Sequence, residues 1–199
     1  MTLSTAQLPS GRVSSRTVYL KELDDRGFVI YSNFGTSRKA KDLESNPHAA
    51  LCFWWKLLER QVRVEGRTER LSRDESQVYF DTRARGSRIG AWASQQTSVL
   101  LPKTTATTVQ SDSSEQEQDD GRAMLESQVA AVEARFKDQD HIPVPPFWGG
   151  LRIIPDTIEF WQGRESRLHD RFRYTRLEPS DGNSNDSTEG EWKIERLNP

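Results

Sequence analysis

The sequence predicts a mainly β fold with flanking helices, in which an antiparallel sheet closes, or nearly closes, into a barrel. Two observations support this. Strand patterns outnumber helical ones, and the two do not alternate regularly as they would in a parallel βαβ sheet. The 199 residues are enough to bury the core of one compact domain. The segments with strand character are 15–23, 27–33, 49–55, 60–71, 151–161 and 191–197.

Alternation and turn residues justify these strands. In the segment 60–71, Val62 and Val64 alternate with charged neighbours, which is the period of a strand with one buried face. Between the first two segments, Gly27 follows Asp24 and two further polar residues. Residues of these types favour a hairpin turn.

Three segments have helical patterns. Residues 37–45 are polar on one side and are stopped by an Asn-Pro pair. Ser72 and Glu75 have the spacing of a capping box, so a second helix should begin there and carry Arg83. The segment 122–138 places apolar residues on one face, which fits an amphipathic helix.

Two segments are too polar to join the core. Residues 102–121 are acidic and nearly free of large apolar groups, so they cannot bury enough surface to become ordered. Residues 177–191 form a second polar loop, which should join two antiparallel strands. We therefore expect a single domain over residues 1–199, with a flexible surface insertion at 102–121 and a polar loop at 177–191.

The overall charge excludes a general polyanion binder. The chain has 28 basic and 30 acidic residues and a formal net charge of −2, whereas such a binder is usually strongly basic. Any basic site must therefore be local. The stretch 160–176 is the clearest candidate, because it contains five arginines and four aromatic residues.

Cysteine usage and hydropathy indicate a soluble cytoplasmic protein. Cys52 is the only cysteine, and its apolar surroundings favour a small buried side chain over a nucleophile. No apolar stretch is long enough to cross a bilayer, and no signal-peptide pattern opens the chain. His48, His141 and His169 lack the spacing of zinc ligands, so no metal site is expected.

Three further groups of residues could bind anions. The first predicted strand carries one, with Arg16 and Lys21. For the stretch 160–176, the alternative is an exposed strand edge blunted by charge. The stretch 35–39 opens the first predicted helix, where free N–H groups and the helix dipole favour a phosphate, and a solvated helix start is the alternative. Tyr79 and Arg83 are one helical turn apart, and Ser87 follows in a predicted turn. These three could hold a phosphorylated ring, or be an exposed arginine beside a glycine C-cap.

Two bound phosphates explain several anion-binding groups on a nearly neutral chain better than solubility does. RNA is the competing ligand, because arginines beside aromatic rings also suit base stacking. The acidic segment and the lack of an overall basic surface weaken that alternative.

These groups, in this order, resemble the pyridoxamine/pyridoxine 5′-phosphate oxidase family. The resemblance runs from about residue 14 to the end of the chain, apart from the polar insertion. Its most specific motifs are WQGRESRLHDR and RGSRIGAW. The other matching segments are SSRTVYLK, YSNFGTSRKAKDLESNPHAAL, ERQVRVEGRTERLS and WKIERLNP.

The resemblance implies a six-stranded antiparallel FMN-binding split β-barrel and a homodimer with FMN at its interface. It implies oxidation of pyridoxamine or pyridoxine 5′-phosphate to pyridoxal 5′-phosphate, with dioxygen as acceptor and hydrogen peroxide as the reduced product. We expect no nucleic-acid or membrane partner. A non-catalytic FMN or pyridoxal-phosphate binding protein on the same fold is the alternative.

The resemblance also assigns a cofactor site. Arg38 and Lys39 resemble the residues that hold the FMN phosphate, a group that basic side chains bind through charge-assisted hydrogen bonds. The residues expected to contact FMN are Arg16, Thr17, Val18, Tyr19, Leu20, Lys21, Tyr31, Ser32, Arg38, Lys39, Gln61, Gln96, Thr97, Trp161 and Arg171.

Catalytic and substrate-binding residues follow from the same resemblance. Arg167 and His169 are the implied catalytic pair. Two apart on an extended strand, they would point to the same side and orient the pyridine ring. The residues expected to bind substrate are Lys21, Tyr79, Arg83, Ser87, Arg167 and His169, the first four as a clamp on its phosphate.

Two features depart from the family pattern. Members usually have an additional N-terminal segment, part of which closes over the substrate, and nothing corresponds to it before MTLSTAQ. We expect its absence to affect substrate sequestration. The turn at 35–37 is one residue longer than usual, which would shift the FMN phosphate.

Overall fold

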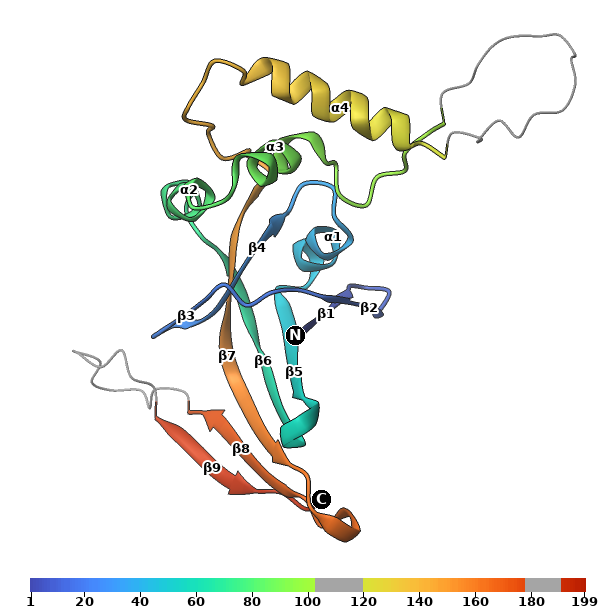
Figure 1. Cartoon of the computed structure of the whole chain (residues 1–199). Helices are drawn as coiled ribbons and strands as arrows, with labels where there is room; N and C mark the ends of the chain where they lie inside the picture. Colours follow the sequence, from blue (N-terminus) through green and yellow to red (C-terminus); the bar gives the residue numbers. More distant parts are fainter. Residues whose placement is uncertain (103–119, 178–190) are drawn as a thin grey trace, which may run out of the picture. The chain divides into compact units, whose positions relative to one another are not determined.

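The computed structural model describes residues 1–102, 120–177 and 191–199, and Figure 1 shows its elements in chain order. The expected insertion at 102–121 and loop at 177–191 lie outside the described residues except at their ends. The chain divides into two compact units, so the single domain stays a prediction. Unit 1 is Met1–Ser32, Arg38–Leu71 and Gly150–Pro199, and unit 2 is Asn33–Ser37 and Ser72–Gly149.

One mainly antiparallel sheet dominates the fold, which confirms the predicted fold class. Its order is β2-β1-β5-β6-β7-β4-β3, with β8 beside β7 and β9 beside β8. The strands are β1 (Thr2–Gln7), β2 (Arg12–Thr17), β3 (Glu22–Asp24), β4 (Gly27–Asn33), β5 (His48–Trp55), β6 (Arg60–Arg70), β7 (Trp148–Gln162), β8 (Asp170–Arg176) and β9 (Trp192–Arg196).

The sheet is not closed, and it has nine strands in the described part of the chain where six were expected. A strand has two edges, and one edge of β7 is paired with β6 over most of its length. The other edge of β7 pairs with β4 and with β8, and β8 pairs in turn with β9 (Figure 1). No described strand joins β2 to β3, so the two ends of the sheet stay apart.

The first predicted strand, 15–23, is in fact parts of two strands with a break at 18–21. The break arises because the chain changes partner: β2 pairs with β1, whereas β3 pairs with β4. Hydrogen bonds mark both ends of the crossing, from Val18 N to Met1 O (2.9 Å) and from Lys21 N to Val29 O (3.0 Å).

The predicted hairpin at Gly27 is confirmed. The Asp24 carboxylate accepts hydrogen bonds from the backbone N–H groups of Arg26 and Gly27, both at 2.9 Å, and closes the turn between β3 and β4. Gly27 has φ +155°, and a Cβ atom there would lie 2.2 Å from the carbonyl oxygen of Ile153. Only glycine permits this close approach of the two strands.

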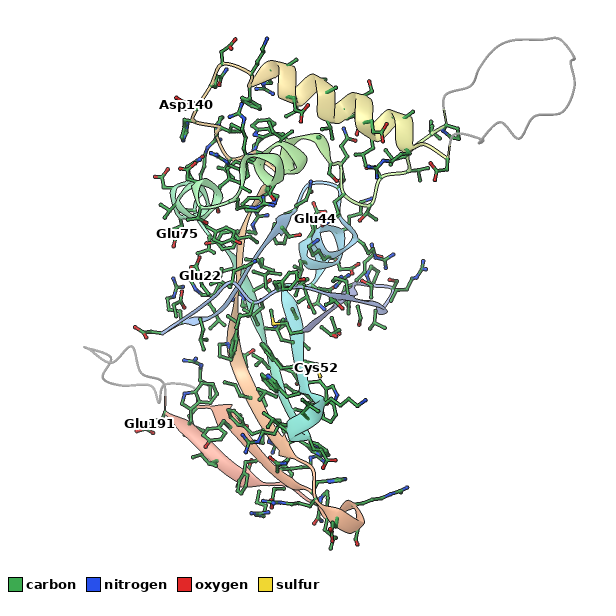
Figure 2. All side chains as sticks on the ribbon, viewed as in Figure 1. Glu22, Glu44, Cys52, Glu75, Asp140 and Glu191 are labelled. Carbon is green, nitrogen blue, oxygen red and sulfur yellow. The ribbon has the colours of Figure 1, made fainter. Side chains whose placement is uncertain are left out.

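Unit 1 has its core on the sheet. The predicted alternation of β6 is confirmed, since Val64 is fully buried and its neighbours Arg63 and Glu65 are exposed. Helix α1 (Arg38–Ser45) also belongs to this unit. Cys52 lies on β5 and is half-buried (Figure 2). The other buried apolar residues of this unit include Leu3, Val29, Ile30, Leu51, Leu151 and Ile153.

Unit 2 is largely helical. Its helices are α2 (Arg73–Asp81), α3 (Arg85–Ala93) and α4 (Arg122–Arg135). The predicted capping box is confirmed: Glu75 N donates to Ser72 Oγ (3.2 Å) and Ser72 N donates to Glu75 Oε2 (2.7 Å). The buried side chains of this unit include Phe80, Ile89, Phe136, Ile142, Val144 and Trp148.

Two local predictions in unit 2 are wrong. Arg83 lies beyond the end of α2, because that helix stops at Asp81 with Thr82 as its C-cap. Ser87 is not in a turn but in the first turn of α3, where its N–H donates to Ala84 O at 2.9 Å. Gly86 and Gly90 make this segment look like a turn in the sequence, although apolar residues such as Ile89 bury one face of a helix.

Candidate active site

A cluster of cations surrounds one buried carboxylate in unit 1. Arg16 comes from β2, and Arg38 and Lys39 come from the first turn of α1. Asp42, one turn further along α1, accepts a hydrogen bond from Arg38 Nε at 2.8 Å and lies 3.8 Å from Arg16 Nη2. The side chains of Arg16, Arg38 and Asp42 are 22%, 36% and 0% exposed. The guanidinium groups therefore lie nearer to solvent than the carboxylate does.

The protein environment fixes the charges of this cluster. Burial and, to a lesser extent, the positive charge of Arg16 lower the pKa of Lys39 to about 8. Burial alone would raise the pKa of Asp42, but hydrogen bonds from two hydroxyls and a guanidinium outweigh it and hold that pKa below its ordinary value. With Lys39 protonated, three cations oppose one carboxylate. This surplus of positive charge is the arrangement that a phosphate dianion requires.

The remaining predicted cofactor residues of this region lie at the end of β2, on the crossing at 18–21 and on β4. Tyr19 is 79% exposed, and Lys21 Nζ lies 5.1 Å from the centre of its ring. Tyr31 and Ser32 are half-buried on β4, and the hydroxyl of Tyr31 donates to Glu22 at 2.9 Å. Thr17 and Leu20 are exposed, whereas Val18 is half-buried.

Three predicted cofactor residues form a row across adjacent strands. Gln61 on β6 is opposite Trp161 on β7, which is opposite Arg171 on β8. Directly opposite residues share one face of a sheet, so the three side chains are neighbours. Arg171 Nε donates to Glu159 at 2.8 Å, and this bond raises the pKa of Arg171. The row thus combines an amide, an indole ring and a guanidinium held by a nearly buried carboxylate.

A groove of about 540 Å³ lies beside this row in unit 1. Gln61 and Trp161 line it, together with the exposed rings of Trp55 and Phe160. Arg171 lines a second hollow, of about 610 Å³, whose walls are mostly charged side chains of β6, β7, β8 and β9. The row therefore lies between an apolar surface and a charged one.

The predicted catalytic pair does not lie on an extended strand. Arg167 ends the short 3₁₀ turn Glu165–Arg167, and β8 begins only at Asp170. Ser166 and Arg167 have φ values of 55° and 63°, a left-handed conformation that is strained for residues other than glycine. The strand prediction failed because motif spacing does not reveal such a turn.

His169 nevertheless has a defined position. Its ring lies 4.7 Å from that of Trp161, centre to centre, and its Nδ1 accepts a hydrogen bond from Arg164 N at 3.1 Å. Because Nδ1 is the acceptor, the neutral ring carries its proton on Nε2, which can then donate to a ligand. Arg164 itself pairs with Asp170 at 2.7 Å.

In unit 2, Tyr79 and Arg83 meet at one tryptophan. The ring of Tyr79 stacks on Trp148 with an interplanar angle of 9°, and the guanidinium carbon of Arg83 lies 4.8 Å from the Trp148 ring. Burial lowers the pKa of Arg83, against the raising influence of Tyr79. Nη1 of Arg83 is buried and has no hydrogen-bond partner among the described residues. A buried donor without an acceptor is costly, so an anionic ligand suits this position.

Gln96 and Thr97 lie after α3 in an exposed segment of unit 2. The Gln96 carbonyl accepts a hydrogen bond from Thr36 Oγ1 at 2.8 Å. Thr97 has φ 78°, and both residues line a hollow of about 220 Å³ with Met124, Leu125 and other neighbours. Ser87 is exposed near the start of α3.

Asp42 is the residue that the sequence predictions missed. Its separation of four residues from Arg38 in a predicted helix was a usable signal, because side chains at i and i+4 are neighbours on a helix. Its contacts with β1 and β2 had no local signal, because they depend on how the strands pair.

Solved structures identify the class of fold. PhzG from Burkholderia lata 383, in complex with tetrahydrophenazine-1-carboxylic acid, matches all of this chain and 81% of its own, with a TM-score of 0.73 and 27% identity. A pyridoxamine 5′-phosphate oxidase-related, FMN-binding protein from Nostoc punctiforme matches all of this chain and 86% of its own, with a TM-score of 0.62 and 16% identity. The second match shows the fold alone.

Sequence comparison then gives the family. Residues 1–136 match the family model described as pyridoxamine 5′-phosphate oxidase, and residues 148–199 match the pyridoxine 5′-phosphate oxidase C-terminal dimerisation region. This chain belongs to the pyridoxamine 5′-phosphate oxidase family.

Curated relatives agree with this assignment. The pyridoxamine 5′-phosphate oxidase of Saccharomyces cerevisiae is 51% identical over all of this chain and 75% of its own length. The probable pyridoxamine 5′-phosphate oxidase of Schizosaccharomyces pombe is 55% identical over 88% of this chain and 68% of its own. The pyridoxine/pyridoxamine 5′-phosphate oxidase of Psychromonas ingrahamii is 48% identical over all of this chain and 76% of its own.

Proposed function

We propose that this chain oxidises pyridoxamine 5′-phosphate and pyridoxine 5′-phosphate to pyridoxal 5′-phosphate, with FMN as cofactor and dioxygen as acceptor. The alcohol and dioxygen yield the aldehyde and hydrogen peroxide. The amine consumes one water in addition and also releases ammonia. The observation that supports this most directly is the 51% identity to the Saccharomyces cerevisiae oxidase along the whole of this chain.

Arg16, Arg38 and Lys39 are the proposed ligands of the FMN phosphate. Their excess of positive charge over Asp42, together with the partial exposure of Arg16 and Arg38, fits a dianion. Bound FMN would supply the redox chemistry by accepting two electrons and a proton from the substrate and passing electrons to dioxygen. The other residues proposed to contact FMN are Thr17, Val18, Tyr19, Leu20, Lys21, Tyr31, Ser32, Gln61, Gln96, Thr97, Trp161 and Arg171.

The row Gln61–Trp161–Arg171 is the proposed neighbour of the flavin ring. A flat ring packs well on an indole, and a guanidinium stabilises negative charge that develops on a flavin during reduction. The bond from Arg171 to Glu159 holds that guanidinium in place, so it does not have to reorganise during the reaction.

Arg83, with Lys21, Tyr79 and Ser87, is the proposed clamp on the substrate phosphate. The buried Nη1 of Arg83 supports this role, because a phosphate oxygen would satisfy a donor that lacks a partner in the described chain. Arg167 and His169 are proposed to orient the pyridine ring, with Nε2–H of His169 as a hydrogen-bond donor.

A homodimer is the proposed assembly, with FMN at its interface. The dimerisation region matched by residues 148–199 includes β7, β8 and β9, and therefore Trp161 and Arg171. Among the described residues no helix has the length and apolar character needed to cross a membrane. The cytoplasmic location expected from the sequence stays a prediction.

The purified protein tests the proposal in two steps. It should be yellow and contain one FMN per chain, and it should form pyridoxal 5′-phosphate and hydrogen peroxide in equal amounts when given pyridoxine 5′-phosphate in air. A protein that retains FMN but forms no pyridoxal 5′-phosphate would be a binding protein, and the oxidase proposal would be wrong. A colourless protein that does not take up FMN would contradict the cofactor as well.

A further inference from the structure

The feature that the proposed reaction does not use is Asp42, which is fully buried beneath the cation cluster. Its Oδ2 accepts hydrogen bonds from Thr5 Oγ1 at 2.7 Å and from Ser14 Oγ at 2.6 Å. Its Oδ1 accepts from Arg38 Nε at 2.8 Å. One carboxylate thus links β1, β2 and α1, which supply these three donors.

The same groups also hold Arg16. Its Nη1 donates to Thr5 Oγ1 at 2.8 Å and to the carbonyl of Leu3 at 3.2 Å, and its Nη2 donates to Ser14 Oγ at 2.5 Å. Thr5 and Ser14 are therefore shared between the guanidinium of Arg16 and the carboxylate of Asp42. Such a shared network leaves both charged groups little freedom to rotate.

Asp42 does not itself reach a ligand. Its side chain is 0% exposed, whereas those of Arg16 and Arg38 are 22% and 36% exposed. Any influence on a phosphate must therefore act through the arginines. The contacts support such an indirect influence, because Arg16 and Arg38 are both hydrogen-bonded on their buried side.

We propose that Asp42 is a positioning residue for the cofactor phosphate, which fixes Arg16 and Arg38 in the arrangement that binds it. The inference rests on the proposed function, because it takes FMN as the ligand of this cluster. A site organised in advance loses less side-chain entropy when the ligand arrives, and this makes binding tighter.

The charge of Asp42 and its positioning role predict opposite results. A carboxylate repels a phosphate, so its removal would tighten FMN binding if charge alone mattered. Its removal would weaken FMN binding if the arginines depend on it for their positions. The direction of the change in affinity therefore distinguishes the two effects.

The test is the affinity of FMN and of riboflavin for this chain and its variants. Riboflavin has the same ring system without the phosphate. In Asp42→Asn, FMN should bind about tenfold or more weakly, since a buried hydrogen-bond network is left unsatisfied. Riboflavin affinity should stay unchanged, so the preference for FMN over riboflavin should fall by the same factor.

A milder pair of variants covers the case in which Asp42→Asn does not fold. Ser14→Ala removes the hydroxyl between Arg16 and Asp42 and should weaken FMN binding severalfold, again without affecting riboflavin. Ser15→Ala is the matched control, because the exposed Ser15 bonds to Ser4 instead (2.8 Å) and should leave both affinities unchanged.

Four results would contradict either the proposal or the function on which it rests. If FMN binds the Asp42→Asn variant as tightly as it binds the unmodified chain, or more tightly, then Asp42 does not position the arginines for the phosphate. Equal losses for FMN and riboflavin in Ser14→Ala would indicate a general defect in the fold. An unmodified chain with no preference for FMN over riboflavin would contradict the proposed function itself. If the unmodified chain oxidises substrate and the Asp42→Asn and Ser14→Ala variants bind FMN as tightly as it does, only the inference about Asp42 would be wrong.

Discussion

The two groups of cations proposed to bind phosphates are held in different ways. In unit 1, the buried carboxylate of Asp42 binds Arg38 directly and Arg16 through shared hydroxyls. In unit 2, Arg83 is held by aromatic rings, at 4.8 Å from Trp148 and 5.7 Å from Phe80, and its Nη1 lacks a partner among the described residues. The first group is organised before a ligand arrives, whereas the second retains a donor that a ligand would satisfy. This difference suits a cofactor that stays bound and a substrate that binds and leaves in every turnover.

The largest effect should come from removing the two cations of α1 together. Arg38→Ala with Lys39→Met should weaken FMN binding on the order of a thousandfold, because two charged hydrogen-bond donors to the phosphate are lost. Fluorescence titration of the flavin measures the affinity. Lys41→Ala is the control, because Lys41 is exposed on the same helix. Unchanged FMN affinity in the double variant would rule out the phosphate site proposed there.

A smaller effect, on substrate and not on cofactor, should follow the loss of Arg83. Arg83→Met should lower kcat/KM for pyridoxine 5′-phosphate about a hundredfold, because one guanidinium leaves the phosphate clamp. FMN content should not change. Arg122→Ala is the control in unit 2, since that side chain is 71% exposed and pairs with Glu126. A loss of FMN in Arg83→Met would show that the two groups of cations are not specialised.

Arg167 should matter less than Arg83, because it is proposed to orient a ring and not to bind a dianion. Arg167→Ala should lower kcat about tenfold with FMN still bound. Steady-state kinetics with both substrates, together with the flavin spectrum, measures this. Full activity in the variant would remove Arg167 from the proposed site.

The smallest effect concerns pH and Lys39. Its pKa, lowered to about 8 by burial, means that it binds phosphate as a cation below pH 8 and must take up a proton to do so above it. FMN affinity should thus be level between about pH 7 and 8, where the phosphate is a dianion, and fall by at most about tenfold per pH unit above pH 8. Lys39→Met should remove this dependence. If the FMN affinity of Lys39→Met declines in the same way above pH 8, the decline must come from another titrating group.

The sequence predicted the elements that carry a local signal. Alternation of valines marked β6, the Ser72–Glu75 pair marked the start of α2, and Gly27 marked a hairpin. Each depends on neighbours within a few residues. The family motifs predicted the candidate site residues, and the row Gln61–Trp161–Arg171 shows three of them side by side.

Elements without such a local signal were missed by the sequence predictions or were predicted wrongly. β8 has four charged residues in seven. Two of its arginines pair with Glu159 on β7 and Glu195 on β9, which only the strand pairing brings near. The left-handed turn at Arg167 and the contacts of Asp42 with two strands also depend on tertiary structure. The open sheet followed from β4 and β8 sharing one edge of β7.

The most direct test of the central claim is reduction of the bound flavin by substrate without oxygen. The purified, FMN-loaded protein is mixed anaerobically with pyridoxine 5′-phosphate, and the flavin absorbance is followed before and after air is admitted. The account predicts that the yellow colour bleaches as pyridoxal 5′-phosphate forms, and returns when oxygen enters. A flavin that stays oxidised in the presence of excess substrate would contradict it.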